Sequence, residues 1–191
     1  MTVTTEAPDQ RSRILDAALE LMSSQGSSAA SMRQLAAACN LNVATLYHYF
    51  PSKADLLRSV IAERRYGERL AAEAPPVDPA TLPRERLAFL LEWLWTNALA
   101  EEAVWRLLVG EGIRQEEAAV ATTTEVVEAL TVAMEAWLRD DFPELRGDPA
   151  AVARVIRGQV FAQVVEHLAI RPVTPAAARD RAHELAAVIF P

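Results

Sequence analysis

The 191-residue sequence contains little of what most enzymes and metalloproteins need. Its single cysteine, Cys39, excludes an internal disulfide and argues against a cysteine-based metal site. The three histidines are not paired at metal-ligand spacing, and the sequence has neither a glycine-rich phosphate loop nor a nucleophile elbow. We therefore expect no catalytic residues, no bound metal and no cofactor.

Long apolar runs are also missing. No stretch approaches the roughly 20 uninterrupted apolar residues that a membrane-spanning helix needs. The first residues lack the basic and then apolar arrangement of a signal peptide. The sequence therefore predicts a cytoplasmic protein with no membrane partner, in which residues 1–10 form a disordered arm.

Glycine is scarce, and this scarcity favours helices. Six glycines, many alanines and 51% apolar residues fit helices packed around a substantial core. Apolar residues recur at helical spacing between breaks that proline, glycine and asparagine supply. The expected helices span residues 11–24, 32–39, 43–50, 53–74, 84–100, 102–111, 114–140, 149–170 and 175–190. With no convincing strand or repeat, the sequence predicts an all-α fold of about nine helices.

Positive charge is in deficit overall, but the deficit is unevenly distributed. The formal net charge is −7. Residues 1–65 carry seven basic and six acidic side chains, a balance of +1, so the rest of the chain carries −8. The distribution matters more than the sum, because a near-neutral N-terminal part can still present a basic face to nucleic acid. Such binding weakens as salt is added.

Residues that begin and end helices define a compact motif in this N-terminal part. Ser31 can cap the second expected helix, and Gln34 completes a capping box. Asn40 suits the turn that follows, since asparagine tolerates a positive φ. Asn42 can cap the third helix, which Pro51 prevents from continuing. The same residues that delimit the helices thus predict a helix-turn-helix.

The third expected helix is short and has one face suited to DNA. Helices of this length are marginal alone, so they need mutual packing. Leu46, Tyr49 and Phe50 have the spacing to pack inward, as ordinary core residues do. The exposed face would carry Val43, Ala44, Thr45, Tyr47 and His48. These small or hydrogen-bonding groups fit the major groove, which admits one α-helix.

Three segments of this region resemble the TetR family of transcriptional regulators. They are ILDAA at 14–18, SMRQLA at 31–36 and the run 41–57, in which TLYHYFPSKADLL is a close match. The motif covers about a quarter of the chain; beyond it the resemblance rests on length and helix count. Family members usually have glycine at Asn40 and often at Ala44, and the added methyl of Ala44 could alter base preference.

The resemblance implies roles for individual residues. Tyr47 looks like the family tyrosine whose hydroxyl reaches a phosphate, whereas Thr45 and His48 look like groove-facing residues. Lys53, the only lysine, matches a family lysine at a helix start, where the ammonium and the helix N-terminus face one phosphate. Lys53 would also fit an ordinary solvated helix start. The expected DNA-binding set is Ser31, Arg33, Asn42, Val43, Ala44, Thr45, Tyr47, His48 and Lys53.

For the C-terminal two thirds, the resemblance implies ligand binding and dimerisation. The pocket candidates are Phe89, Trp93, Trp105, Thr123, Val127 and Met134. The candidates for a subunit interface are Val152, Ile156, Val160, Gln163, Val164, His167, Ala182, Leu185 and Ile189. Each set has an ordinary alternative, because aromatics at helical spacing also form cores and an apolar stripe also packs within one subunit.

The sequence as a whole predicts a homodimeric repressor that a small-molecule effector releases from a palindromic, double-stranded DNA operator. Residues 1–55 would form the DNA-binding domain, and residues 56–191 the ligand-binding and dimerisation domain. The alternative is a helical regulator or interaction protein that answers to a protein partner, without a small-molecule effector.

Overall fold

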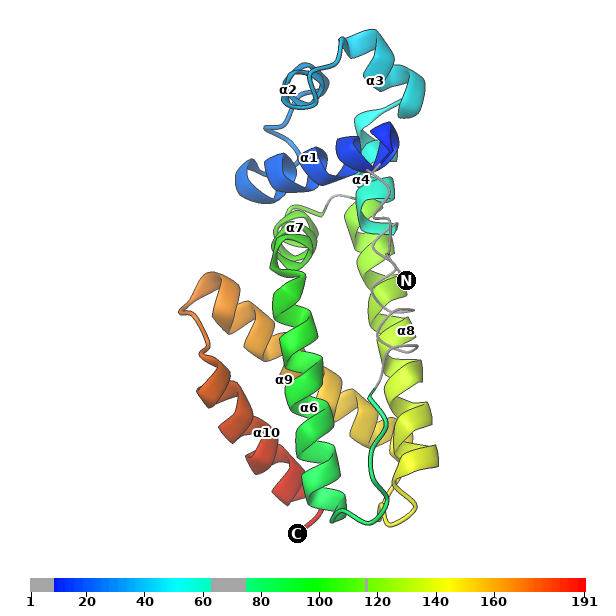
Figure 1. The fold of residues 1–191 in the computed structure, drawn as a ribbon, viewed down its shortest axis with the longest axis vertical. Helices are drawn as coiled ribbons and strands as arrows, with labels where there is room; N and C mark the ends of the chain where they lie inside the picture. The colour runs from blue at the N-terminus through cyan, green and yellow to red at the C-terminus, as the bar shows by residue number, and fades with distance from the viewer. Residues whose placement is uncertain (1–8, 63–74, 116) are drawn as a thin grey trace, which may run out of the picture. The chain divides into compact units, whose positions relative to one another are not determined.

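The structure is a computed structural model that describes residues 9–62, 75–115 and 117–191. Within these ranges the chain forms nine helices and no strand (Figure 1). The helices are α1 (Gln10–Gln25), α2 (Met32–Ala38), α3 (Val43–Tyr49), α4 (Lys53–Ala62), α6 (Pro83–Ala100), α7 (Glu102–Ile113), α8 (Glu117–Asp141), α9 (Pro149–Ala169) and α10 (Pro175–Ile189). The predicted all-α class is confirmed.

The helices gather into two compact units. The N-terminal unit comprises Met1–Arg64 and Arg106–Thr123, and the C-terminal unit comprises Arg65–Trp105 and Thr124–Pro191. Helices α7 and α8 therefore each contribute residues to both units. The division of function predicted between residues 55 and 56 is a different division and stays a prediction.

Local side-chain chemistry sets the helix starts. The predicted caps accept hydrogen bonds from backbone N–H groups in the first turns of α2, α3, α9 and α10; they are Ser31, Asn42, Asp148 and Thr174. Asp9 caps α1 and Gln10 is its first residue, so this helix begins within the arm predicted to be disordered. Residues 1–8 of that arm, and residues 63–74 of the helix predicted at 53–74, lie outside the described residues.

In the N-terminal unit, α1 packs on α2 and α4, and α2 packs on α3. The centre of this packing is fully buried and consists of Ile14, Ala18, Met22, Leu35, Leu46 and Leu56. The Arg11 guanidinium lies over the ring of Phe50, 5.3 Å from its centroid. Because helices this short are marginal alone, their mutual packing is what holds α3 in place.

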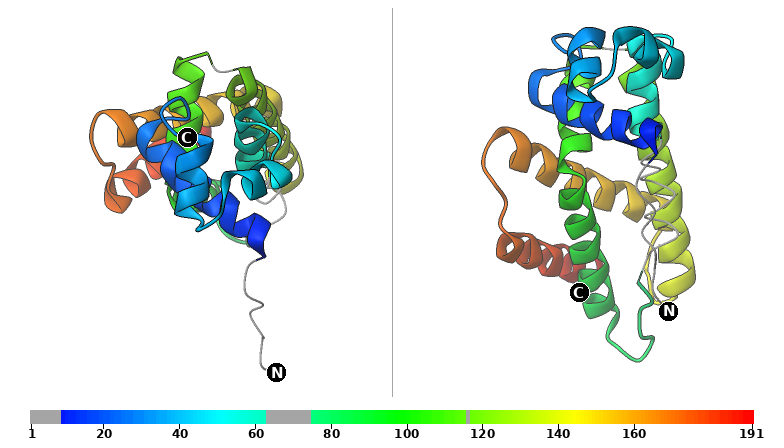
Figure 2. Two further views of the ribbon diagram at one scale, coloured as in Figure 1. Left: turned by 90° about the horizontal axis from the view of Figure 1, so that it is seen from above. Right: turned by 45° about the horizontal axis from the view of Figure 1, so that its top comes forward.

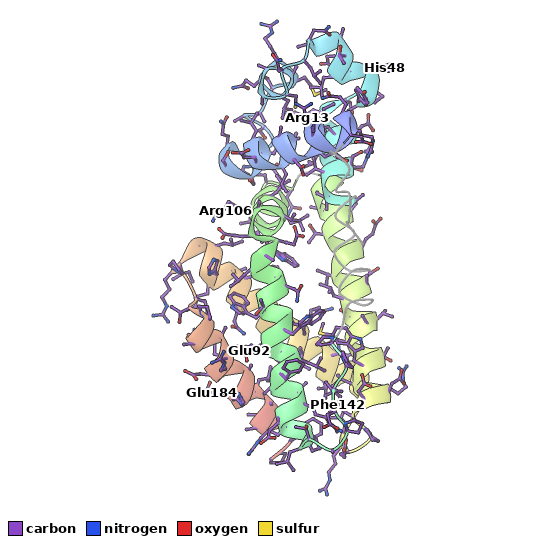
Figure 3. The ribbon with its side chains drawn as sticks, viewed as in Figure 1. Arg13, His48, Glu92, Arg106, Phe142 and Glu184 are labelled. Carbon is purple, nitrogen blue, oxygen red and sulfur yellow. The ribbon has the colours of Figure 1, made fainter. Side chains whose placement is uncertain are left out.

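In the C-terminal unit, α6 lies beside α10 and also contacts α9 (Figures 1 and 2). Glu92 of α6 pairs with Arg179 of α10 at 2.8 Å. Phe142, at the end of α8, stacks on Phe190 with ring centroids 5.7 Å apart. Figure 3 labels Glu92 and Phe142 on these elements. Packing between α6 and its neighbours thus forms the core of this unit.

Candidate nucleic-acid interface

The start of α2 and the turn after it have closely specified geometry. Ser31 and Gln34 form the predicted capping box: the Gln34 backbone N–H donates to Ser31 Oγ at 3.2 Å, and the Ser31 backbone N–H donates to Gln34 Oε1 at 2.9 Å. Asn40 has the predicted positive φ, of 55°. The Leu41 backbone N–H then returns to the Ala36 carbonyl at 2.8 Å. The turn therefore fixes where the chain enters α3.

Helix α3 divides into an inward and an outward face. Leu46 is fully buried and Phe50, just after the helix, is 2% exposed. Ala44, Tyr47 and His48 are exposed, and Figure 3 labels His48 at the outer end of the N-terminal unit. The predicted DNA-facing side chains of α3 are thus accessible, with Val43 and Thr45 partly so.

Tyr49 departs from its expected place. The spacing predicted an inward-facing aromatic, yet the side chain is 37% exposed. Its ring meets the His48 ring edge-on, with centroids 5.9 Å apart. Phe50 occupies the core position instead, because α3 ends at Tyr49 and the chain turns there toward Pro51. Tyr49 therefore adds an exposed aromatic edge beside the predicted contact residues.

The other predicted contacts lie on α2 and at the start of α4. Ser31 and Arg33 are exposed on α2. Ser52 begins α4 with Asp55: the Asp55 backbone N–H donates to Ser52 Oγ at 3.0 Å, and Ser52 Oγ donates to Asp55 Oδ2 at 2.7 Å. The hydrogen bond from Ser52, assisted by Arg58, lowers the pKa of Asp55. The α4 start therefore holds a carboxylate as well as the ammonium of Lys53.

Lys53 has partners that the sequence did not indicate. Its Nζ donates to the backbone carbonyl of Ser27 at 2.8 Å and to that of Ser28 at 3.4 Å. Both carbonyls belong to the connection between α1 and α2, which lies 25 and 26 residues earlier in the chain. Only a local signal, the helix cap, was readable at Lys53. All nine predicted DNA-binding residues nevertheless lie in the N-terminal unit.

The predicted pocket residues do not line one cavity. Met134 lines a cavity of about 10 Å³ with Trp137, whose ring meets that of Trp93 edge-on at 5.9 Å. Trp105 is buried beside a second cavity of about 10 Å³, next to His167. The remaining candidates lie apart from both lists of lining residues: Phe89 is 51% exposed, Val127 is half-buried, and Thr123 belongs to the N-terminal unit.

Sequence reasoning overlooked a wider hollow in the C-terminal unit. Its volume is about 680 Å³, and its lining includes Arg84, Arg146, Val188 and Phe190. Nothing in the sequence singled it out, because its lining comes from a helix start, an interhelical connection and the chain's last residues. Those segments are brought together only by the fold.

The predicted interface residues fall mainly on the inner faces of their helices. Ile156, Gln163, Val164 and Ala182 are buried within the C-terminal unit. Half-buried are Val152, Val160, His167, Leu185 and Ile189. The opposite face of α9 exposes residues that were not predicted: Val155 (57% exposed), Gly158, Phe161 (44%) and Ala162. On α10, Val188 is 78% exposed.

Two chemical features bear on other classes of function. Within 9–62, 75–115 and 117–191, no three His, Cys, Asp or Glu side chains gather where they could hold a metal ion. In the same ranges, no helix has the length and apolar character needed to cross a membrane. Cys39 is buried at 8% exposure, and this burial raises the pKa of its thiol.

Comparison with known proteins gives consistent matches. Residues 14–60 match the family described as bacterial regulatory proteins, tetR family. The HTH-type transcriptional repressor KstR of Rhodococcus jostii (strain RHA1) is 33% identical over 163 residues, which are 85% of this chain and 74% of that protein. Solved structures of similar fold include GusR of Salmonella enterica, with a TM-score of 0.75, 21% identity and full coverage of both chains. A TetR-like regulator from Rhodococcus sp. RHA1 has a TM-score of 0.69 at 25% identity, covering 95% of this chain and 96% of that one.

Proposed function

Because this chain belongs to the TetR family of bacterial regulatory proteins, it is a DNA-binding transcriptional regulator, and we propose that it is a homodimeric, ligand-released repressor. It would act in the cytoplasm on a palindromic operator, by binding and without catalysis. The observation that carries the proposal is the outward face of α3, held by capped turns and presenting Tyr47, His48 and the edge of Thr45.

The proposed DNA contacts fall into two kinds. Tyr47 and Lys53 offer a hydroxyl and an ammonium to phosphates, which position the protein without reading sequence. Thr45 and His48 lie on the face that would enter the major groove, where base edges are distinguishable. Arg33 on α2 and Ser31 at its cap would contact the backbone beside the same groove. Each copy of α3 has seven residues, so it reads one half-site.

A second copy of the chain supplies the second half-site. Two-fold dimers place recognition helices about 34–36 Å apart, which matches successive major grooves on one face of DNA. The outward face of α9 supports this pairing, because Val155 and Phe161 expose large apolar side chains around the small residues Gly158 and Ala162. A two-fold axis would bring this patch against itself. Val188 of α10 would extend it.

Dimerisation is tested with two valine substitutions. Val155→Asp introduces charges into the proposed interface and should convert the dimer to monomers, with loss of operator binding. Val132→Asp is the matched control, since Val132 is 68% exposed on α8. The mass in solution is measured by light scattering and operator affinity by fluorescence anisotropy. A Val155→Asp protein that stays dimeric would remove the α9 face from the proposal.

The effector site is proposed near the Trp93–Trp137 pair and Met134. A cavity of about 10 Å³ holds at most one water molecule. A small molecule would therefore have to separate the two indoles, shifting α6 against α8. Such a ligand changes DNA affinity only by its differential affinity for the two arrangements, typically about 1–3 kcal/mol. The indoles also provide a fluorescence signal at the site itself.

The effector hypothesis is tested by screening small molecules against the protein–operator complex. The expected result is a compound that raises the anisotropy-measured Kd for operator and changes tryptophan fluorescence. Trp93→Phe should weaken the response to that compound, while Trp105→Phe, at the other cavity, serves as the comparison. If the protein binds operator normally but no small molecule alters the Kd, control by a protein partner becomes the better account.

A further inference from the structure

Glu111 of α7 is 1% exposed, which is unusual for a charged side chain. Its carboxylate is well supplied with donors. Ser27 donates from its backbone N–H to Oε1 at 2.9 Å and from its hydroxyl to Oε2 at 2.6 Å. Arg114 Nη1 donates to Oε1 at 2.9 Å. Both oxygens are therefore engaged, which offsets the cost of burying the charge.

The partner of Glu111 is a single residue in the connection between α1 and α2. Ser27 is 4% exposed and follows Gly26, whose φ is 84°. The Arg114 guanidinium covers Gly26, so that a Cβ built there would lie 3.4 Å from Arg114 Cζ. All of these residues belong to the N-terminal unit. Glu111 and Arg114 thus hold this connection from the side and from above.

The same serine binds Lys53 through its other backbone group. Its carbonyl oxygen accepts from Lys53 Nζ at 2.8 Å, while its N–H and hydroxyl are held by Glu111. A lysine ammonium has three donors, and the carbonyls of Ser27 and Ser28 take two of them. One donor is left for a phosphate. A free lysine side chain would lose roughly 2 kcal/mol of rotamer entropy on being fixed.

We propose that Glu111 is a positioning residue for operator binding: through Ser27 it fixes the carbonyl that aims the Lys53 ammonium at a DNA phosphate. The proposal rests on the phosphate-binding role given to Lys53 above. Glu111 itself does not reach DNA, because it is buried and negatively charged. Its effect on affinity must therefore pass through Lys53, and this requirement makes the proposal testable.

The test is a double-mutant cycle in the full-length protein with Glu111→Leu and Lys53→Ala. Leucine has a similar size but no acceptor, so Ser27 loses its anchor. Lys53→Ala should weaken operator binding about tenfold, the effect of one charge-assisted hydrogen bond. Glu111→Leu should weaken it roughly three- to tenfold in the wild type and not at all in the Lys53→Ala background. Glu111→Gln, which keeps one acceptor, should fall between, and it carries the cycle if the leucine variant does not fold.

A second readout separates positioning from loss of stability. The slope of log affinity against log salt should fall by about 0.9 for Lys53→Ala, as for one lost phosphate contact, and by a similar amount for Glu111→Leu. Leu108→Ala, a buried change on the same helix, is the matched control. It should lower the melting temperature yet leave the salt slope unchanged.

The outcomes are distinct. If Lys53→Ala changes affinity and slope but Glu111 substitutions are additive with it or leave the slope unchanged, the positioning role is overturned and the phosphate role of Lys53 stands. If Lys53→Ala itself changes neither quantity, both the role of Lys53 and the inference built on it fail. Non-additive losses with matching slopes support the proposal.

Discussion

Asn42 Oδ1 accepts two hydrogen bonds from Thr45, one from its backbone N–H at 2.7 Å and one from its hydroxyl at 3.0 Å. The first bond caps α3. The second commits the hydroxyl hydrogen of Thr45 to the protein, so that this side chain presents a lone pair and a methyl group outward. One asparagine therefore both starts the recognition helix and sets the chemistry of a residue on its face.

Replacing Asn42 separates these two effects. Asn42→Ala should lower the free energy of unfolding by about 1 kcal/mol, as loss of a side-chain cap does. It should also change operator preference, since the Thr45 hydroxyl becomes free to donate. Asn42→Ser is the control, because serine keeps the cap. Urea unfolding and selection of binding sites from random DNA measure the two effects; unchanged stability in the alanine variant would contradict the capping role.

Tyr47 and His48 should differ in kind. Tyr47→Phe removes one hydroxyl from a side chain that is 46% exposed, so stability should hardly change. If that hydroxyl reaches a phosphate, affinity should fall by a similar factor for every operator sequence. His48→Asn should instead redistribute preference among bases. Anisotropy titrations against a panel of single-base operator variants distinguish a uniform loss from a selective one, and a uniform loss for His48→Asn would contradict its base-reading role.

The features that the sequence predicted well depend on neighbours a few residues apart. The caps at Ser31 and Asn42 and the positive φ at Asn40 follow from short-range chemistry. Tyr49 was misplaced because spacing alone does not show where a short helix ends. The contact between Ser27 and Glu111 joins residues 84 positions apart. No periodicity encodes such a contact, so only the fold reveals it.

The α9 helix shows a second limit of sequence reasoning. Apolar side chains occur on two of its faces, with Ile156 buried inside the unit and Val155 exposed. A helix that is apolar nearly all round has no single stripe that identifies its inward face. The sequence therefore indicated that α9 packs extensively but did not distinguish packing within the subunit from packing between subunits.

Cys39 should behave as a core residue. It is 8% exposed, and burial raises the pKa of its thiol, which keeps little of it in the nucleophilic thiolate form. We expect an aromatic disulfide reagent to react slowly with the native protein at pH 8 and rapidly in urea. The Cys39→Ala protein should bind operator with unchanged affinity. Fast reaction of the native protein, accompanied by release of DNA, would instead identify a redox switch.

Glu166 should make stability depend on pH. Its carboxylate accepts from Arg181 Nη1 at 2.8 Å and from Arg171 Nε at 2.9 Å. The hydrogen bond from Arg181, followed by that from Arg171, lowers its pKa from 4.5 to about 2. Because the folded pKa is depressed, the stabilisation is complete above the unfolded value near 4.5 and is lost as pH falls toward 2.

The measurement is chemical unfolding of the wild type and of Glu166→Gln between pH 2 and pH 7, at fixed protein concentration. The wild type should be more stable than the variant above pH 5, and the difference should disappear as the pH approaches 2. Added salt should reduce the difference, since these groups are partly exposed and are screened. Glu85→Gln, at an exposed position on α6, is the control. A wild-type advantage that persists unchanged at pH 2 would show that Glu166 stabilises the fold by packing and not by its charge.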